Sequence, residues 1–501
     1  MKLGELLEQL LAEHSVIRIQ GEKEAEVTAL VYDSRKAVPS GSAFFCISGT
    51  VYDGHEYAVT AAEAGASVIV AEREVALPEG VTLVLVPDTR RALAYMSAAW
   101  FGYPARKLTT IGITGTKGKT TTAYMVYHIL ESVGIKAGLV GSVEIKNGAE
   151  TIAADHTTPE SYLLQKYFRE MVENGCQAVV MEVSSQGLKL SRVAGILFDY
   201  GIFTNLEPDH IGPGEHADFE EYAACKASLF RQCRYGILNA DDPHMERMLQ
   251  EHTCGVMTYG CGEGADLRAT DIDLHRTDGK LMVSYRTEGA LQESFSVPIP
   301  GIFSVYNSLT AVAICMQQKI PTEVMQRALS KVQVRGRLET VEVSPRFSLM
   351  IDYAHNAMSL KSLLTALREY EPKRLVCLFG CGGNRSRSRR FEMGEISSRY
   401  ADLTIVTSDN PRFEEPEAII EDILTGVKKA DGDSVTIADR KEAIRYAIVN
   451  AKEDDVIVLA GKGHEDYQEI RGVKYPMDDR KLVREVVEEL TGEERVRLGI
   501  S

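Results

Sequence analysis

The chain begins with apolar residues repeated at a helical spacing. Leu3, Leu6, Leu7, Leu10 and Leu11 fall on one face of a helix, and acidic residues fall on the other face. A secretory signal peptide would carry a continuous apolar core instead. The pattern therefore indicates an amphipathic helix and argues against a signal peptide.

Short β-like runs follow this helix and lead to a domain boundary. Two of them are SAFFCISG at 42–49 and ASVIVAE at 66–72. The region ends in FGYPARK at 101–107, where Pro104 interrupts helix continuation. We place a boundary there, which predicts a smaller N-terminal α/β domain at residues 1–106.

From residue 107 the pattern changes to apolar strands followed by helices. The first pair is KLTTIGIT at 107–114 and TTTAYMVYHILESVG at 120–134. Later strand-like runs are QAVVMEVS at 177–184, DYGIFTN at 199–205 and YGILNADD at 235–242. Such alternation is typical of a mostly parallel sheet covered by helices, and it predicts a central domain at 107–336.

A second α/β series begins near residue 337 and predicts a third, Rossmann-like domain at 337–501. Its strand-like runs are FSLMIDYAH, RLVCLFG, ADLTIVTS, SVTIAD and DVIVLAG, separated by amphipathic helices. In open parallel sheets, ligands bind beyond the carboxyl ends of the strands. The polar residues at those positions are Glu182, Asn205, Asn239, Asp352 and Asp409.

Composition agrees with a large soluble protein and excludes several classes of function. At 501 residues the chain is expected to form roughly three domains of about 150 residues. The net charge of −16 repels nucleic acid and acidic membranes, so any anionic substrate needs local basic pockets. No uncharged apolar stretch is long enough to span a membrane. Nine scattered cysteines without a C-x-x-C pair indicate a cytoplasmic protein with reduced thiols.

The segment ITGTKGKTTT at 113–122 resembles a phosphate-binding loop with unusual spacing. The common loop, G-x-x-x-x-G-K-[ST], would need glycine at position 113, which is Ile113. The strand, glycine loop and helix order lets main-chain N–H groups cradle phosphates, with Lys119 on the terminal phosphates and Thr120 on magnesium. The alternative is a glycine turn that contains GKT by chance. The candidate loop residues are Gly115, Thr116, Lys117, Gly118, Lys119, Thr120 and Thr121.

Two other residues are candidates for binding magnesium, and a third has no clear function from sequence alone. Glu182 and His210 are expected at strand ends, where a magnesium ion could bridge ATP and an acceptor carboxylate. An isolated strand-end Glu or His is more often a cap or a core hydrogen-bonding residue, but the phosphate-binding loop favours the metal role. Lys226 lies in a helix-like segment and, by itself, is interpreted as a solvated surface lysine.

The short loop G-T-x-G-K-T-T is similar to that of the Mur ligases, ATP-dependent amide-forming enzymes of peptidoglycan precursor synthesis. Ten further segments resemble motifs of that family, in its order, and span essentially the whole chain. They are MEVSS at 181–185, TNLEPDH at 204–210, YAACKASLF at 222–230, NADDP at 239–243, VYNSLTA at 305–311, GRLE at 336–339, DYAH at 352–355, FGCGGNR at 379–385, DNPR at 409–412 and AGKGHEDYQ at 460–468.

The resemblance implies cofactors and residue roles that the sequence alone does not give. It implies ATP, Mg²⁺ and a Lys226 that is carbamylated by carbon dioxide and becomes an anionic magnesium ligand beside Thr120, Glu182 and His210. Arg337 is then the contact to the γ-phosphate. Asn307 and Asp352 resemble the adenosine contacts. His355 belongs to the same motif, where a structural role in the loop is an equal alternative.

The resemblance also implies two substrates, the uridine nucleotide UDP-N-acetylmuramoyl-L-alanyl-D-glutamate and the amino acid meso-diaminopimelate. Residues similar to the uracil-diphosphate contacts are Tyr32, Ser34, Thr50, Val51 and Tyr52, and residues similar to the muramoyl-peptide contacts are Thr157, Thr158, Ser184 and Arg192. Residues similar to the amino-acid contacts are Arg385, Asp409, Asn410, Pro411, Arg412, Gly461 and Glu465. Meso-diaminopimelate carries a distal carboxylate that lysine lacks, and Arg412 offers a guanidinium fork for it.

Several positions depart from the family pattern. Asn384 and Ser386 replace the two carboxylates of the usual G-D-R-D, Asn356 and Ala357 stand where Thr-Pro is usual, Gln186 where His is usual, and Phe391 where Pro is usual. Loss of charge beside Arg385 leaves open a divergent paralogue that adds L-lysine or another amino acid. Two further alternatives are a folylpolyglutamate synthetase-like ligase and an inactive binding paralogue. A monomer is expected.

Overall fold

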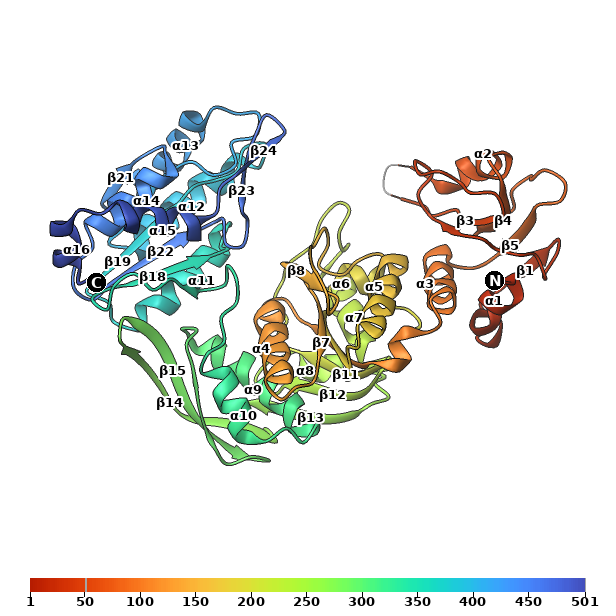
Figure 1. The fold of residues 1–501 in the computed structure, drawn as a ribbon, viewed down its shortest axis with the longest axis horizontal. Coiled ribbons are helices and arrows are strands. Elements are labelled where there is room, and N and C mark those ends of the chain that lie inside the picture. The colour runs from red at the N-terminus through yellow and green to blue at the C-terminus, as the bar shows by residue number, and fades with distance from the viewer. Residues whose placement is uncertain (50–51, 501) are drawn as a thin grey trace. The chain divides into compact units, whose positions relative to one another are not determined.

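The structure is a computed structural model and describes residues 1–49 and 52–500. It confirms the expected α/β class, with separate sheets in the N-terminal, central and C-terminal thirds of the chain (Figure 1). The contacts of the chain divide it into two compact units. The first holds residues 1–260, 264–266 and 313–318, and the second holds 261–263, 267–312 and 319–501.

The N-terminal part of the first unit is a small α/β layer. Its five-stranded sheet has the order β1-β5-β4-β3-β2, parallel except for β1. The strands are β1 (Arg18–Gln20), β2 (Leu30–Val31), β3 (Ser42–Phe45), β4 (Ala66–Ala71) and β5 (Thr82–Leu85). The helices are α1 (Leu3–Ala12), α2 (Ala58–Glu63) and α3 (Thr89–Trp100), with 3₁₀ turns at Gly54–Tyr57 and Pro104–Lys107. Four of the five N-terminal leucines of α1 are buried, which confirms the amphipathic helix.

The larger part of the first unit is the mostly parallel sheet expected after residue 107. In this unit its order is β13-β12-β11-β6-β10-β7-β8-β9, and only β8 and β9 are antiparallel. The strands are β6 (Thr109–Thr114), β7 (Ala137–Val140), β8 (Glu144–Lys146), β9 (Thr151–Ala153), β10 (Ala178–Glu182), β11 (Phe198–Phe203), β12 (Cys233–Asn239) and β13 (Gly255–Gly260). The helices are α4 (Lys119–Ser132), α5 (Ser161–Glu173), α6 (Ser185–Lys189), α7 (Phe219–Ala227) and α8 (Met245–Met248), with a 3₁₀ turn at Ser228–Arg231.

The second unit begins with an antiparallel β-ribbon that the sequence analysis did not predict. It consists of β14 (Leu267–Thr277), β15 (Lys280–Gly289) and β16 (Ser294–Val297). Buried residues alternate with partly or fully exposed ones along β15, so this segment lacks the continuous apolar runs of the parallel strands. Two helices follow, α9 (Ile302–Gln317) and α10 (Thr322–Leu329).

The C-terminal sheet confirms all five strands expected in this part of the chain. Its order is β17-β18-β22-β19-β20-β21, parallel except for β17. The strands are β17 (Glu339–Thr340), β18 (Ser348–Asp352), β19 (Arg374–Phe379), β20 (Leu403–Val406), β21 (Ser434–Thr436) and β22 (Asp455–Ala460). A separate hairpin is formed by β23 (Tyr467–Ile470) and β24 (Val473–Pro476).

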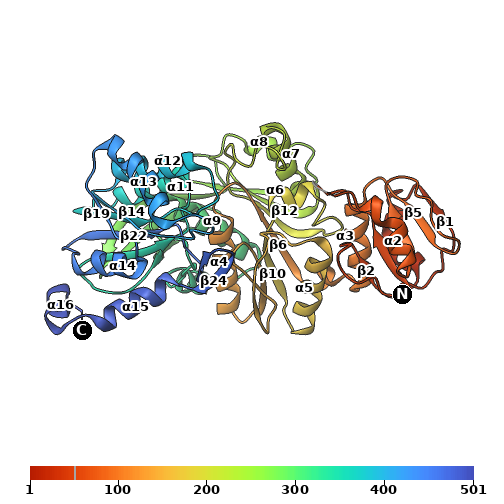
Figure 2. The ribbon, with the colours of Figure 1, turned by 90° about the horizontal axis from the view of Figure 1, so that it is seen from above.

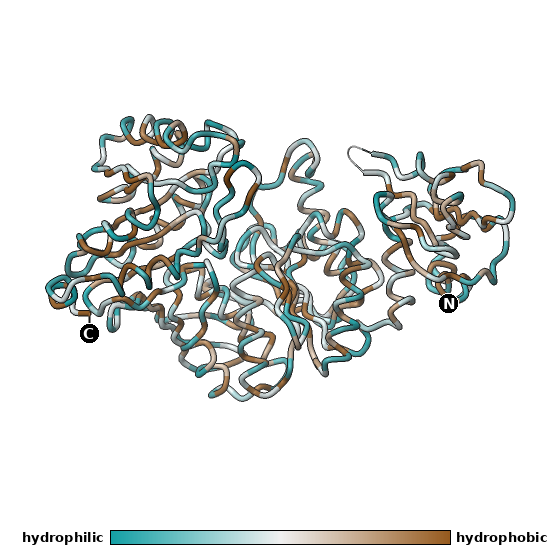
Figure 3. Tube along the Cα trace, turned by 45° about the horizontal axis from the view of Figure 1, so that its top comes forward, coloured by the Kyte–Doolittle hydropathy of each residue, from teal (hydrophilic) through white to brown (hydrophobic). Residues whose placement is uncertain are grey.

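Helices cover this sheet, and apolar strands form its core. The helices are α11 (Ala357–Arg368), α12 (Arg387–Tyr400), α13 (Pro416–Ala430), α14 (Arg440–Val449), α15 (Asp479–Glu489) and α16 (Gly492–Leu498). α12 packs against α11 and α13, and α14 packs against α15 (Figure 2). Figure 3 shows apolar stretches along interior strands, with hydrophilic stretches in many connecting loops. Among the described residues, no helix is long and apolar enough to cross a membrane.

Candidate active site

The glycine loop after β6 has two positions that favour glycine. Gly115 has a φ of +146°, and a Cβ added there would lie 1.9 Å from Oγ1 of Thr204. Gly118 has a φ of +84° and directly precedes α4, which begins at Lys119. The turn brings main-chain N–H groups and a helix N-terminus together, as a phosphate-binding loop requires.

The loop that follows β11 holds the glycine loop in place. The amide of Thr116 donates to the main-chain oxygen of Asn205, and the amide of Lys117 donates to its side-chain Oδ1, both at 2.9 Å. Thr120 and Thr121 are buried in the first turn of α4. Asn205, expected at a strand end, therefore has a structural role in shaping the loop.

Two lysines converge on this loop. Nζ of Lys119 donates to the carbonyl oxygen of Gly115 at 2.9 Å, and Nζ of Lys226 on α7 donates to the same oxygen at 2.8 Å. Lys226 is only 1% exposed and lies 4.6 Å from the ring centroid of Tyr222. Burial, followed by repulsion from Lys119, holds the pKa of Lys226 well below its usual 10.5. The interpretation of Lys226 as a solvated surface lysine is therefore wrong, because α7 turns this residue inward.

Glu182, the last residue of β10, is a buried carboxylate that accepts from neutral groups among the described residues. Its Oε1 accepts from the amide of Ser142 at 2.9 Å, and its Oε2 accepts from the Ser142 hydroxyl at 3.1 Å. The residue is 1% exposed, and no ion pair to it occurs within residues 1–49 and 52–500. A buried carboxylate without a cation is costly. Its chemistry therefore fits a divalent cation, with the buried hydroxyl of Thr120 as a second oxygen donor in the same unit.

His210 does not lie directly at a strand end, as the sequence analysis expected. β11 ends at Phe203, and His210 lies further along the loop that leads to α7. The His210 side chain is half exposed, and its Nδ1 is 3.1 Å from Oε1 of Glu215. The described residues contain no group of three or more His, Cys, Asp or Glu side chains arranged to hold a metal. The expected set contains only two such side chains, Glu182 and His210, so it stays a prediction.

The four residues expected to contact the muramoyl-peptide form one connected cluster. Oγ1 of Thr158 donates to the main-chain oxygen of Glu182 at 2.9 Å and to Oγ of Ser184 at 3.1 Å. Nη1 of Arg192 donates to the main-chain oxygen of Thr158 at 2.9 Å. The hydroxyl of Thr157 lies 3.0 Å from that of Ser142. The cluster therefore lies beside the buried carboxylate, Glu182.

A pocket of about 610 Å³ lies where the uracil-diphosphate contacts were expected. Tyr32, Ser34 and Tyr52 line it, together with Arg90 and Glu160. Burial raises the pKa of Tyr32 to about 12, so its hydroxyl remains a neutral hydrogen-bond donor near pH 7. Thr50 and Val51 lie outside the described residues.

Glu160 links this pocket to the muramoyl-peptide cluster. Its carboxylate lies 2.7 Å from Arg192 and 3.8 Å from Arg90, while it also lines the pocket. Sequence reasoning missed Glu160, Arg90 and Ser142. Ser142 follows the end of β7, so the strand-end rule that selected Glu182 would also have selected it.

In the second unit, Arg337 and Asp352 lie in one cluster. The carboxylate of Asp352 accepts from the amides of Leu338 and Ala354 at 2.9 and 2.8 Å. Burial raises the pKa of Asp352, although the charge of Arg337 opposes that rise. The Arg337 guanidinium lies 5.1 Å from the ring centroid of Tyr353. Asn307 is a buried residue of α9.

His355 packs with two other residues that the sequence analysis did not single out. Its ring centroid is 4.6 Å from that of Tyr353, which is also 4.6 Å from His464. Burial and nearby arginines lower the pKa of His355 and bring that of His464 to about 4. Both imidazoles are therefore neutral near pH 7, and the tilted ring packing against Tyr353 supports the structural role for His355.

The residues expected to contact the amino acid meet beyond the C-terminal sheet. Nδ2 of Asn410 donates to Oε2 of Glu465 at 2.9 Å. The fully buried Lys462 donates to the same Oε2 and to Oδ1 of Asn410, both at 3.0 Å. Gly461 approaches Asp409 so closely that an added Cβ would lie 3.1 Å from Oδ2. Burial raises the pKa of Asp409, which the Lys462 charge counteracts.

Arg412 completes this cluster with a specific pair of contacts. Its Nε donates to Oε2 of Glu469 at 3.1 Å, and its Nη1 donates to the main-chain oxygen of Gly383 at 2.8 Å. Arg412 also has a φ of +53°, which is unusual for a residue with a side chain. Arg385 lies on a different loop, between β19 and α12, is exposed, and has no hydrogen bond within the described residues. Pro411 is buried beside Arg412.

The departures from the family pattern mostly have local structural roles. Oδ1 of Asn384 accepts from the amide of Phe413 at 3.1 Å, so its side chain ties two loops together. Asn356 caps α11 by accepting from the amide of Ser359 at 2.9 Å. Ser386 is the N-cap residue of α12. Nothing in the structure explains Gln186, whose buried Nε2 has no hydrogen-bond partner in the described residues.

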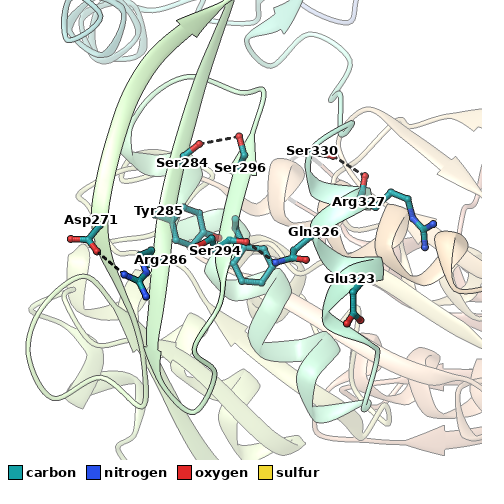
Figure 4. A pocket seen from close by; sticks show the side chains of 11 residues that line it. Asp271, Ser284, Tyr285, Arg286, Ser294, Ser296, Glu323, Gln326, Arg327 and Ser330 are labelled. Carbon is teal, nitrogen blue, oxygen red and sulfur yellow. Dashed lines mark hydrogen bonds and ion pairs between the residues drawn. The ribbon is translucent and has the colours of Figure 1, made fainter.

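A second hollow in the same unit contains none of the expected site residues. Its volume is about 630 Å³, and β15, β16 and α10 line it (Figure 4). Arg286 and Asp271 pair across one side at 3.8 Å, and Arg327 and Glu323 lie on the helix side. Charges of both signs line this hollow, so it has no consistent preference for an anion or a cation.

Three family descriptions match successive parts of the chain. They are the Mur ligase family catalytic domain at 26–101, the Mur ligase middle domain at 113–315 and the Mur ligase glutamate ligase domain at 336–463. UDP-N-acetylmuramoyl-L-alanyl-D-glutamate–2,6-diaminopimelate ligase of Caldanaerobacter subterraneus is 42% identical over 490 residues, which cover 98% of this chain and 99% of that protein. The chain belongs to the Mur ligase family.

Other proteins similar to this Mur ligase include a second relative and two solved structures. The protein called ligase 1 in Clostridium acetobutylicum is 42% identical, covering 97% of this chain and 99% of its own. A solved structure of a UDP-N-acetylmuramoyl-L-alanyl-D-glutamate–2,6-diaminopimelate ligase is 26% identical with a TM-score of 0.71, covering 97% and 99% of the two chains. MurF ligase from Thermotoga maritima in complex with ADP is 18% identical with a TM-score of 0.56, covering 95% and 100%. That last likeness shows a shared fold.

Proposed function

We propose that this Mur ligase joins meso-2,6-diaminopimelate to UDP-N-acetylmuramoyl-L-alanyl-D-glutamate, with ATP as the energy source, in peptidoglycan precursor synthesis. The observation that carries the proposal is the cluster of Arg412, Asn410 and Glu465, which offers a guanidinium and a carboxylate to the two distal charges of that amino acid. Relatives about 42% identical over nearly the full chain bear the name of this reaction.

In this proposal, three parts of the chain each bind one substrate. Residues 1–106 hold the uridine nucleotide, 107–336 hold ATP, and 337–501 hold the amino acid. The pocket of about 610 Å³ lined by Tyr32 and Ser34 supports the first assignment. The ADP complex of a Mur ligase with the same fold supports the second.

A carboxylate must be activated before an amine can displace its oxygen. ATP supplies the phosphoryl group, which makes the carboxylate an acyl phosphate with phosphate as the leaving group. Lys119 and the loop amides hold the phosphates, and the cluster of Thr158, Ser184 and Arg192 holds the acceptor beside Glu182. Arg337 contacts the γ-phosphate, and Asn307 and Asp352 contact adenosine. In this proposal, cations offset the repulsion between two polyanions, ATP and the acceptor nucleotide.

Magnesium, when bound, neutralises phosphate charge and polarises the transferred group. Thr120 and Glu182 would hold it through oxygen atoms, with His210 and the carbamate of Lys226 as the other proposed ligands. The neutral amine of Lys226 adds to carbon dioxide and releases one proton, which leaves an anion on Nζ. The lowered pKa of Lys226 supports this step, because only the unprotonated amine reacts.

The test is phosphate release from ATP with UDP-N-acetylmuramoyl-L-alanyl-D-glutamate and a panel of amino acids. We expect release only when both ATP and the acceptor are present, the highest kcat/KM with meso-diaminopimelate, and no release by Lys119→Ala. Rapid ATP hydrolysis without an acceptor would indicate a generic ATPase. Product mass separates amide formation from hydrolysis.

There are three alternative activities for this site. The strongest alternative is a paralogue that adds L-lysine, because Asn384 and Ser386 carry no charge beside Arg385. A folylpolyglutamate synthetase-like enzyme does not account for the Mur ligase catalytic-domain match at 26–101. An inactive paralogue would be expected to lose catalytic side chains, yet Lys119, Glu182, His210 and Lys226 are all present. The amino-acid panel separates these alternatives.

A further inference from the structure

Arg412 is already paired with a carboxylate of its own chain. Oε2 of Glu469 lies 3.1 Å from Nε of Arg412, and this pair is about three-quarters buried, with side-chain exposures of 22% and 24%. Glu469 lies on β23, a strand of the hairpin, and is 57 residues further along the chain than Arg412. The contact is therefore a tertiary feature, not a local one.

Arg412 is held in place by contacts other than the Glu469 side chain. The amide of Arg412 donates to the main-chain oxygen of Glu469 at 2.9 Å, and the amide of Arg471 donates to the main-chain oxygen of Arg412 at 2.6 Å. Nη1 of Arg412 is separately bound to Gly383. Main-chain bonds and Gly383 thus fix the arginine, and the Glu469 side chain adds mainly a negative charge.

The Glu469 carboxylate and the Gly383 carbonyl oxygen leave Nη2 of the Arg412 guanidinium for a ligand. Glu469 occupies Nε and Gly383 occupies Nη1, while Nη2 has no partner among residues 1–49 and 52–500. An incoming carboxylate must therefore share the guanidinium with Glu469, at a separation where like charges repel. A distal ammonium without a carboxylate meets attraction instead.

We propose that Glu469 sets the amino-acid specificity of this enzyme by partly neutralising Arg412. It weakens the preference for amino acids with a distal carboxylate over those with a distal ammonium alone. Glu465, which accepts from Asn410 and from the buried Lys462, supplies the carboxylate for the ammonium end in both cases. This inference rests on the proposed function, because it concerns the amino acid that the same site selects.

The test compares wild type with Glu469→Gln, using meso-diaminopimelate and L-lysine at saturating ATP and acceptor. The amide keeps the size of the side chain and its hydrogen bond to Arg412 but removes the charge. We expect the KM for meso-diaminopimelate to fall about threefold to tenfold and the KM for L-lysine to rise by a similar factor. High salt should reduce both effects.

Glu415→Gln is the matched control, because Glu415 is exposed and its one ion pair within the described residues is with Arg471 at 3.6 Å, not with Arg412. It should leave both KM values within about twofold of wild type. If Glu469 merely positions Arg412, Glu469→Gln raises the KM for meso-diaminopimelate, and the inference is overturned. Parallel changes with both amino acids, or no change, also overturn it. If wild type joins neither amino acid to the acceptor, the proposed function itself fails.

Discussion

Lys119 and Lys226 donate hydrogen bonds to the same atom, the carbonyl oxygen of Gly115, at 2.9 and 2.8 Å. Two ammonium groups on one acceptor repel each other, and Lys226 is also buried. Burial, followed by repulsion from Lys119, lowers the pKa of Lys226 well below its usual value, which favours the neutral amine at Nζ.

Replacing Lys226 with alanine should remove most ligase activity. The missing group in our proposal is an anion on Nζ, so a short carboxylate such as acetate should restore part of the activity while bicarbonate should not. Steady-state phosphate release measures both. Lys166→Ala on α5, which removes a half-exposed lysine, serves as the control and should retain activity. Full activity in Lys226→Ala would contradict the carbamate.

The stability of the carbon dioxide-free protein should depend on pH through Lys226. Its pKa is lower in the folded state than the usual 10.5, so between these two values the unfolded chain binds more protons. Stability therefore rises with pH across that window and is reduced below it, where the buried ammonium is charged. Lys226→Met should remove this contribution. Urea unfolding at several pH values, for both proteins, tests the difference in slope.

Ser142→Ala should weaken magnesium binding without unfolding the protein. The substitution removes the hydroxyl bond to Oε2 of Glu182 at 3.1 Å and keeps the amide bond to Oε1. A hydrogen bond to a charged group contributes about 1.5–3 kcal/mol, so the Mg²⁺ concentration for half-maximal activity should rise at least about tenfold. Ser132→Ala on the exposed end of α4 is the control. An unchanged magnesium requirement would mean that Ser142 does not position Glu182.

The parallel strands could be predicted from sequence because both faces of their sheets are buried. β10 and β22 are apolar along nearly their whole lengths, and every residue of both is buried. The β14–β15 ribbon could not, since its alternating pattern also suits irregular surface segments. The glycine loop could be predicted for a different reason, because its strand, its glycines and its helix follow one another directly in the sequence.

The site contacts depend on long-range packing that no local pattern encodes. Lys226 has the sequence context of a surface lysine, and only the packing of α7 against the glycine loop, where Nζ donates to Gly115, reveals its burial. The charges of Arg412 and Glu469 meet because the β23–β24 hairpin bonds to the DNPR segment. Family motifs identified Arg412 in advance, but they contained no signal that Glu469 would pair with it.

The guanidinium of Arg412 has one nitrogen, Nη2, that remains available to a ligand. Its Nη2 has no partner in the part of the chain that the structure describes, while Nη1 is held by Gly383 at 2.8 Å. A charge-assisted bond to the distal carboxylate of meso-diaminopimelate contributes about 1.5–3 kcal/mol, equivalent to roughly 10- to 150-fold in affinity. Arg412→Ala should therefore raise the KM for meso-diaminopimelate at least about tenfold and leave the KM for ATP nearly unchanged.

Arg412→Lys should restore only part of this loss, because a single ammonium cannot reproduce the planar fork of the guanidinium. L-lysine, which has no distal carboxylate, should lose little affinity in either variant. Steady-state kinetics of wild type and both variants, with both amino acids, give the comparison. If wild type uses L-lysine as well as meso-diaminopimelate, Arg412 does not select the distal carboxylate, and the uncharged residues Asn384 and Ser386 beside Arg385 matter more for the choice of amino acid.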